Sequence, residues 1–184
     1  LQTSGMAAYD LYSIHMVDAS TGFIVGTAGA ILKTTDGGSN WTSQTSGVIQ
    51  TLYSIDMLDS NTGFIVGHDG ASQGNPILKT TDGGNNWIEL DSGIESTLND
   101  IYFLNSDVGW AVGTNGIIIS TYDGGNSWVN EYSGVLQDLK SIQIFDPNNG
   151  KLLGEDSQGS LLLNRNVRGG SGNFFNFLLN ELFQ

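Results

Sequence analysis

Short apolar segments alternate with turns rich in Gly, Ser, Thr and Asn along most of the chain. Residues 52–57 read Leu-Tyr-Ser-Ile-Asp-Met, a period-two alternation that predicts a β-strand with Tyr53 and Ile55 on one face. Three further strands are predicted at 63–67, 76–80 and 87–90. Since no helical periodicity competes with these segments, the pattern predicts an all-β fold.

This pattern is repeated. Thr21-Gly-Phe-Ile-Val-Gly26 returns unchanged at 62–67, 41 residues later, and as Val-Gly-Trp-Ala-Val-Gly at 108–113. A diverged fourth copy, Asn-Gly-Lys-Leu-Leu-Gly, occupies 149–154. Four strands in a repeat of about 41 residues form the unit of a β-propeller blade, which buries both faces only against neighbouring blades. We therefore predict a β-propeller of four four-stranded blades.

The two ends of the repeat array predict how the ring closes. Gln2-Thr-Ser-Gly5 matches Gln44-Thr-Ser-Gly47, the end of a fourth strand. The last repeat has three predicted strands, at 141–145, 151–154 and 160–164. We expect residues 1–5 to complete this blade and close the ring, which removes the exposed sheet edges. Two chains sharing an eight-bladed ring is the alternative. The repeats are 6–47, 48–93, 94–134 and 135–164 plus 1–5, together one domain, 1–164.

Composition limits the classes of function. The chain has 26 Gly, no Cys, and 19 acidic against 6 basic residues, for a formal net charge of −13. Disulfides are therefore impossible, and the chain lacks the basic stripe that binds nucleic acid or an anionic membrane surface. No apolar run is long enough for a membrane span. Residues 1–164 hold 18 acidic and 4 basic residues, which favours a basic or neutral polar partner.

A location outside the cytoplasm is expected. The absence of Cys and the scarcity of Lys are compatible with an exported protein, and the chain begins at Leu1 without an initiator Met. We therefore expect an extracellular, cell-surface or periplasmic protein whose signal peptide has already been removed.

A second motif, Thr-x-Asp-Gly-Gly-x-x-Trp, follows the third predicted strand in three repeats. It matches the Asp-box of bacterial neuraminidase repeats. Its residues are Thr34, Asp36, Gly38 and Trp41; Thr80, Asp82, Gly84 and Trp87; and Thr121, Asp123, Gly125 and Trp128. With the flanking Gly-Phe-Ile-Val-Gly and the trailing Gln-Thr-Ser-Gly, the repeat resembles that of the photosynthesis system II assembly factor family over residues 1–164. The resemblance implies a propeller with Asp-box turns on its periphery.

The Asp-boxes are expected to be structural. An Asp beside Gly-Gly accepts hydrogen bonds from its own turn, and the Trp buries its large face between blades. Turns spread around a periphery cannot bring together the paired carboxylates that glycoside hydrolysis needs. We therefore predict no catalytic residues, no metal site and no cofactor.

The enzymes that share the Asp-box are disfavoured. Sialidases of that family bind the substrate carboxylate with three Arg, and this chain has two, Arg165 and Arg168, both beyond the last predicted strand. The xyloglucan-degrading propeller enzymes place their catalytic sites between two larger propellers. We therefore expect no enzymatic activity.

A binding function stays open. Trp110 stands where two other repeats have Phe23 and Phe64, and we expect it in the core, with a sugar-stacking platform as the alternative. The segment from His68 to Pro76 is five residues longer than its counterpart in the first repeat. Variable loops on a regular scaffold often carry recognition, although a surface insertion without function is an equal alternative.

The C-terminal segment does not belong to the repeat. Residues 165–172 read as a flexible linker, and residues 173–184 are rich in Phe and Leu. On a helix, four of these side chains would form an apolar stripe that must be covered. The tail docks on its own propeller, in a neighbouring subunit or at an interface, or it is an engineered fusion peptide. The candidate partner-binding residues are Phe174, Phe175, Leu178, Leu179, Leu182, Trp110 and His68.

These observations predict a non-enzymatic, secreted or surface propeller that acts as a protein-interaction or assembly scaffold. Its partner would be another protein or a second copy bound through the tail. A secreted carbohydrate-binding or glycan-degrading module is one alternative. A protein like the photosystem II assembly and stability factors, as the resemblance implies, is another.

Overall fold

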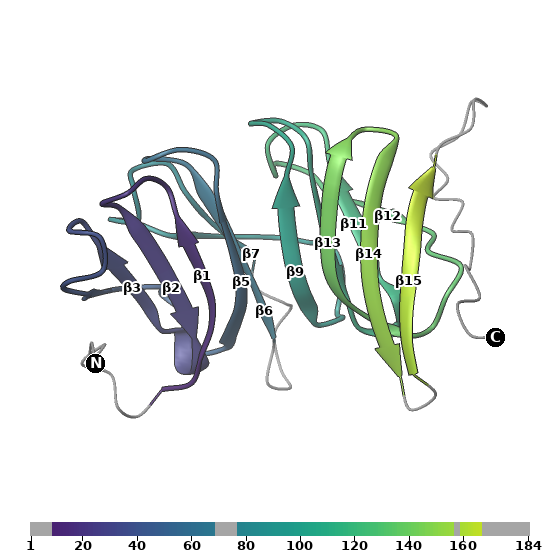
Figure 1. Ribbon diagram of the computed structural model, residues 1–184, viewed down its shortest axis with the longest axis horizontal. Helices are drawn as coiled ribbons and strands as arrows, with labels where there is room; N and C mark the ends of the chain where they lie inside the picture. Colours follow the sequence, from purple (N-terminus) through teal and green to yellow (C-terminus); the bar gives the residue numbers. More distant parts are fainter. Residues whose placement is uncertain (1–8, 69–76, 157–158, 167–184) are drawn as a thin grey trace. The chain divides into compact units, whose positions relative to one another are not determined.

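The computed structural model describes residues 9–68, 77–156 and 159–166 (Figure 1). The predicted ring-closing segment 1–5, most of the long loop and the tail 173–184 lie outside these ranges, so ring closure and tail docking stay predictions. The chain divides into two compact units, Leu1–Glu95 and Ser96–Gln184. The division falls close to the predicted boundary between the second and third repeats.

Unit 1 contains two four-stranded sheets. Blade 1 consists of β1 (Leu11–Met16), β2 (Gly22–Gly26), β3 (Ile31–Thr34) and β4 (Thr42–Gln44). Blade 2 consists of β5 (Thr51–Met57), β6 (Gly63–His68), β7 (Ile77–Thr80) and β8 (Ile88–Leu90). The short 3-10 helix η1 (Thr27–Gly29) connects β2 to β3. Within each blade, every strand pairs antiparallel with the next along the chain.

Unit 2 repeats this arrangement. Blade 3 consists of β9 (Leu98–Phe103), β10 (Gly109–Gly113), β11 (Ile118–Thr121) and β12 (Val129–Glu131), with the 3-10 helix η2 (Thr114–Gly116) after β10. Blade 4 consists of β13 (Asp138–Asp146), β14 (Asn149–Asp156) and β15 (Gly159–Asn166). Among the described residues this last sheet has three strands. The prediction of an all-β fold built from propeller blades is confirmed.

Within each unit, an apolar face of one blade packs against an apolar face of the next blade. We call the side of a blade that packs on the next blade its forward face, and the opposite side its backward face. In unit 1 the core cluster contains Phe23, Val25 and Ile31 from blade 1 with Leu52, Ile55, Met57, Ile65 and Leu78 from blade 2. In unit 2 it contains Trp110, Val112 and Ile118 from blade 3 with Leu139, Ile142, Ile144, Leu152 and Leu163 from blade 4. The repeated sequence thus produces the same kind of hydrophobic contact between blades in both units; we call this contact the joint.

The first strand of each blade departs from strict alternation. The prediction that Tyr53 and Ile55 share a face is wrong, because the pairing of β5 with β6 shifts between Leu52 and Ser54. Such a bulge adds one residue and resets which side chains point inward. As a result Leu52, Ile55 and Met57 are the buried apolar residues of the strand, at 0, 4 and 5% exposure. The ring of Tyr53 instead contacts that of Tyr12 in β1, with centroids 5.2 Å apart.

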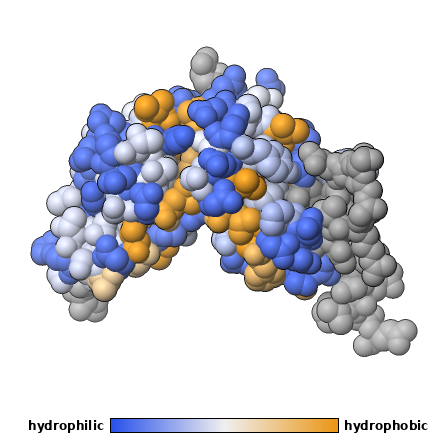
Figure 2. Space-filling model, turned by 90° about the horizontal axis from the view of Figure 1, so that it is seen from above, coloured by the Kyte–Doolittle hydropathy of each residue, from blue (hydrophilic) through white to orange (hydrophobic). Residues whose placement is uncertain are grey.

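The backward face of blade 1 is exposed in the described structure. Leu11, Ile14 and Met16 occupy the positions of the buried triad of blade 2, yet they are 40, 61 and 41% exposed. The view in Figure 2 shows small hydrophobic areas separated by hydrophilic residues.

In residues 9–68, 77–156 and 159–166, no helix is long and apolar enough to cross a membrane.

Candidate functional site

Each Asp-box is a turn held by its own side chains. In blade 2, Thr80 Oγ1 donates a hydrogen bond to Asp82 Oδ1 and accepts one from the buried N–H of Gly84, both at 2.9 Å. Asp82 also accepts hydrogen bonds from the backbone and side-chain nitrogens of Asn86, at 2.9 and 2.7 Å. The same bonds recur around Thr34, Asp36, Gly38 and Asn40, and around Thr121, Asp123, Gly125 and Ser127.

These hydrogen bonds hold the pKa of all three Asp-box carboxyls below the ordinary value of 3.8. The largest cause is the side chain of Asn40 for Asp36, Asn86 for Asp82 and Ser127 for Asp123. Backbone N–H groups lower the pKa further, while desolvation opposes them. The carboxylates are therefore ionised at neutral pH and bonded within their own turns. In the part of the chain that the structure describes, no group of three or more His, Asp or Glu could hold a metal ion.

The Asp-box of blade 2 also contacts the preceding blade. The ring of Trp87 meets that of Phe23 edge to face, and Lys33 Nζ donates a hydrogen bond to the carbonyl of Gly83 at 2.6 Å. The ammonium of Lys33 lies 5.4 Å from the centre of the Phe23 ring. A Cβ on Gly84 would come within 2.7 Å of the Phe23 ring. The turn therefore joins two blades as well as closing a hairpin.

Blade 4 has no Asp-box, and the joint in unit 2 differs accordingly. Trp110 is fully buried, as expected of a core residue, so its ring offers no exposed platform for a sugar. Its edge contact comes from Tyr122 of its own blade, at 6.5 Å and 81°. Tyr122 stands where the other two Asp-boxes have Thr35 and Thr81, so two residues that differ from their counterparts contact each other. The ring of Trp128 contacts that of Phe103 in β9 of its own blade edge to face, with centroids 6.1 Å apart.

The other predicted partner-binding residues lie wholly or partly outside the described residues. His68 ends β6, where its backbone pairs with Thr51, and its side chain lies outside the description. The five tail residues Phe174, Phe175, Leu178, Leu179 and Leu182 also lie outside the described residues. Their role in partner binding stays a prediction.

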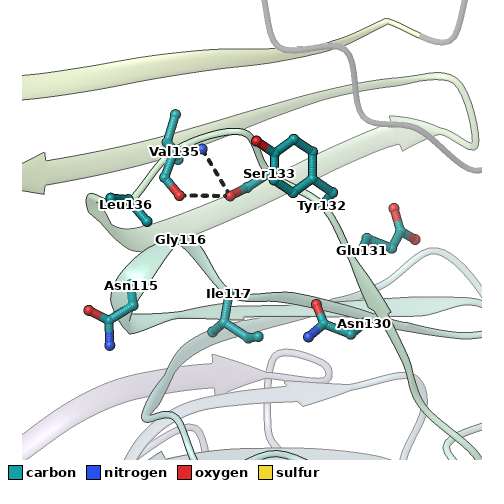
Figure 3. Close-up of a pocket in the computed structure, with 9 residues that line it drawn as sticks. All are labelled: Asn115, Gly116, Ile117, Asn130, Glu131, Tyr132, Ser133, Val135 and Leu136. Carbon is teal, nitrogen blue, oxygen red and sulfur yellow. Dashed lines mark hydrogen bonds between the residues drawn. The ribbon is translucent and has the colours of Figure 1, made fainter.

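A pocket of about 420 Å³ opens at the end of β12 in blade 3 (Figure 3). It is lined by Asn115, Gly116, Ile117, Asn130, Glu131, Tyr132, Ser133, Val135 and Leu136. Ser133 Oγ donates to the carbonyl of Val135 at 3.2 Å and accepts from its N–H at 3.3 Å. Gly116 has φ +70°, and a Cβ there would stand 2.1 Å from the Val135 oxygen. Only glycine therefore fits against this turn.

The chemistry of this pocket is specific to blade 3. The turn itself recurs, since Ser46 makes the same two bonds with Val48 in blade 1. The residues around it change: blade 3 has Glu131, Tyr132 and Leu136 where blade 1 has Gln44, Thr45 and Ile49. Glu131 is 5% exposed, whereas Tyr132 and Leu136 are 74 and 85% exposed. This site was not predicted, although the three substitutions are visible when the repeats are aligned position by position.

A comparison with family models decides the relationship. The photosynthesis system II assembly factor YCF48 family matches residues 5–93 and 85–163. The chain belongs to this family. The resemblance seen in the Asp-box repeats is thereby confirmed. A comparison with curated proteins found no match.

Solved structures of this family share the fold. A structure described as YCF48 bound to D1 peptide superposes with a TM-score of 0.69 at 22% identity, covering 90% of this chain and 51% of that one. YCF48 from Cyanidioschyzon merolae gives 0.69 at 19% identity, covering 92% and 56%. The chain thus spans about half the length of these relatives. A GH74 enzyme from Niastella koreensis gives 0.65 at 16% identity, covering 84% and 28%.

Membership of the YCF48 family overturns one prediction. An extracellular, cell-surface or periplasmic location was expected from the absence of Cys and the scarcity of Lys. That expectation is wrong, since the YCF48 assembly factors lie in the thylakoid lumen or elsewhere within cells rather than outside them. Composition failed as a guide because a lack of thiols and few basic residues suit any acidic protein rich in turns.

Proposed function

We propose that this member of the YCF48 family is a protein-binding module that takes up a segment of a partner protein and catalyses no reaction. The observation that carries the proposal is a difference between two sets of polar residues, those of the Asp-boxes and those around the blade 3 pocket. The three repeated carboxylates are bonded within their own turns. By contrast, Glu131, Tyr132 and Leu136, which differ from their counterparts in blade 1, line an open pocket in blade 3. A repeated scaffold with one distinctive surface is typical of a recognition module.

The family supports the same proposal. One relative has been solved bound to a D1 peptide, so a YCF48 protein does bind a peptide segment. A role in photosystem II assembly follows for this chain as the more specific form of the proposal. It replaces the secreted scaffold as the preferred function.

The experiment measures binding of the D1 peptide to the purified chain by fluorescence anisotropy, with a scrambled peptide of the same composition as the control. We expect saturable binding of the D1 peptide and at least tenfold weaker binding of the scrambled one. Equal binding of both peptides, or none of either, would contradict the proposal.

A carbohydrate-binding or glycan-degrading module is the second candidate. The observation in its favour is Tyr132, an aromatic ring 74% exposed at the rim of a pocket, since such rings stack on sugars. Titration with xyloglucan oligosaccharides, followed by an assay for released reducing ends, tests it. Binding that disappears in Tyr132→Thr, or any hydrolysis, would favour this candidate over the peptide-binding module.

Self-association through the tail is a separate part of the proposal. Native mass spectrometry measures how many chains each assembly contains, for the full chain and for a chain that ends at residue 168. Oligomers in the full chain and monomers in the shortened one are expected if the tail docks in a neighbour. Equal states of assembly would exclude that role.

A further inference from the structure

The forward face of blade 4 carries two exposed leucines. Leu153 of β14 and Leu162 of β15 are paired across the two strands, and they are 47 and 43% exposed. Their neighbours Leu152 and Leu163 are also paired, are fully buried, and belong to the core cluster that joins blade 4 to blade 3. Since successive side chains of a strand point to opposite faces, the exposed pair lies on the side away from blade 3.

The same position is covered in each blade that is followed by another blade of its unit. Val25 pairs with Ile31 in blade 1, and Val112 pairs with Ile118 in blade 3. All four side chains are 0% exposed and belong to the clusters that the following blade completes. Blade 4 therefore keeps a large apolar pair at a position that the fold buries elsewhere, which favours a further contact at this face.

The rest of this face does not fit another Asp-box blade. In blade 1 the adjacent cross-strand pair is Phe23 with Lys33, and the Phe23 ring meets Trp87 of the following Asp-box. In blade 4 the corresponding pair is Lys151 with Asn164, and the lysine donates a hydrogen bond to the side-chain oxygen of the asparagine. Because Lys151 replaces the ring that an Asp-box Trp would meet, we expect a shorter apolar segment to cover the two leucines.

The segment that follows β15 supplies apolar side chains. Residues 173–184 contain four Phe and three Leu, and Glu181 is their single charged residue. Residues 167–184 contain neither the Gly-x-x-x-Gly pattern of the second strand nor the Asp-Gly-Gly turn, so they are not a fifth repeat. An apolar segment of this kind is stable in water only when another apolar surface covers it.

The connection is long enough for the tail to return to blade 4. Leu162 lies four residues before the end of β15 at Asn166, roughly 13 Å back along the strand. Eight residues lead from Asn166 to Phe174, and eight extended residues span up to roughly 29 Å. A short connection rich in Gly also gives the tail an effective concentration in the millimolar range at its own blade. Docking on the same chain is therefore favoured in dilute solution.

We infer that Leu153 and Leu162 form the docking surface for the chain's own residues 173–184, which cover the forward face of blade 4 in place of a following blade. The terminal units of repeat proteins require such a cap, because each unit buries its faces only against a neighbour. The inference goes beyond peptide binding and does not depend on it. Exchange of tails between two copies would use the same surface, and only this exchanged form rests on the proposed self-association.

The test compares methyl NMR spectra of the full chain and of a chain that ends at residue 168. Removing the tail should shift the signals of Leu153 and Leu162 more than those of Leu152 and Leu163, which face blade 3. Adding a synthetic peptide of residues 173–184 to the shortened chain should return the signals toward their positions in the full chain. Unchanged signals of the exposed pair, or larger shifts on the backward face of blade 1, would overturn the inference.

Two double variants of the full chain separate docking from folding. Leu153→Ser with Leu162→Ser should release residues 173–184, whose amide signals then take up random-coil positions. Leu153→Val with Leu162→Ile introduces the residues that blade 1 has at these positions and should keep the tail docked. In the shortened chain, the serine variant should bind the tail peptide roughly tenfold more weakly, since apolar contact is lost.

The control is Leu136→Ser, which removes a leucine that is 85% exposed in blade 3 and should leave the tail signals as they are in the unaltered chain. If the serine variant of blade 4 also leaves them unaltered, the tail docks elsewhere and the inference is wrong.

A spin label identifies the chain that supplies the tail. Since the chain has no Cys, Asn180→Cys offers a single attachment site. An isotope-labelled chain that carries the label should lose the signals of Leu153 and Leu162. A mixture of spin-labelled chains with separate isotope-labelled chains should keep them in dilute solution, and their loss there would contradict docking on the same chain.

The proposed function is tested without the tail, by titrating the D1 peptide against the chain that ends at residue 168. Binding of the D1 peptide without tail docking in the full chain would leave peptide binding standing and remove this inference. Tail docking without binding of the D1 peptide would have the opposite meaning.

Discussion

The indole of Trp87 meets the ring of Phe23 edge to face, with centroids 6.4 Å apart and 87° between the ring planes. Trp87 belongs to the Asp-box of blade 2, and Phe23 to β2 of blade 1. The hydrogen bond from Lys33 to Gly83 joins the same two blades. The Asp-box therefore contributes to cohesion between blades, which its local hydrogen bonds alone would not reveal.

Phe23→Ala should destabilise unit 1 strongly. The side chain is fully buried, and its removal leaves a cavity beneath Trp87 and Gly84. Truncations of buried Phe typically cost about 3–5 kcal/mol. Urea unfolding followed by tryptophan fluorescence measures the change. Ile88→Ala, at a side chain 63% exposed, is the control and should change the free energy of unfolding by less than about 0.5 kcal/mol. Similar midpoints for both variants would show that the joint is not a stabilising element.

Thr80→Val should destabilise the Asp-box although it preserves the shape of the side chain. The Thr80 hydroxyl accepts the buried N–H of Gly84 and donates to Asp82. Without the hydroxyl, a buried donor is left unsatisfied, which costs about 1–3 kcal/mol. Thr80→Ser keeps the hydroxyl and should recover most of that loss. The prediction fails if Thr80→Ser and Thr80→Val unfold at the same denaturant concentration.

The features that the sequence predicted correctly are local. A strand of three to nine residues, or an Asp-box turn, depends on residues within a few positions of each other, so the repeats predicted these elements. The bulge near Tyr53 was missed because period-two alternation assumes that no residue is added to the strand. A position of the Asp-box Trp between blades was predicted, but the partner of Trp87 was not, because Phe23 is far from it in sequence and the repeat pattern carries no information on their pairing.

The candidate site was less predictable for a physical reason. A pocket arises from the difference between one blade and the others, whereas a repeat is recognised by what the blades share. Trp110 was singled out as a departure from Phe23 and Phe64, but its contact with the ring of Tyr122 joins two different strands and was not predicted. Glu131 was overlooked because an acidic residue on a strand is normally exposed, and here it is buried.

Acid should unfold the protein in part through the Asp-boxes. The pKa values of Asp36, Asp82 and Asp123 are lowered in the folded state by bonds to Asn40, Asn86 and Ser127. The unfolded chain, with pKa values near 3.8, therefore takes up protons first as the pH falls. The stabilisation is complete above the unfolded pKa and is lost as the pH falls from about 3.8 through the lower folded values.

The measurement is the unfolding temperature between pH 6 and pH 2. The variant with Asp36→Asn, Asp82→Asn and Asp123→Asn should have a lower unfolding temperature than the unaltered protein at pH 6. Its unfolding temperature should also fall less between pH 6 and pH 2. Parallel curves for the two proteins would mean that the acid sensitivity comes from other carboxylates.

Two equivalent isoleucines test whether the array of blades closes on itself. Ile14 in β1 and Ile55 in β5 occupy the same position in their blades, but they are 61 and 4% exposed. Ile55→Ala should cost about 2–5 kcal/mol, the range for truncation of a buried Ile. From its exposure, Ile14→Ala should cost less than about 0.5 kcal/mol. A ring closed by residues 1–5 and the last blade would bury Ile14 as the preceding blade buries Ile55. Equal losses of unfolding free energy in the two variants would therefore contradict the exposure of Ile14 and favour a closed ring. A loss that does not depend on protein concentration would indicate closure within one chain, and a loss that does would indicate closure between two chains.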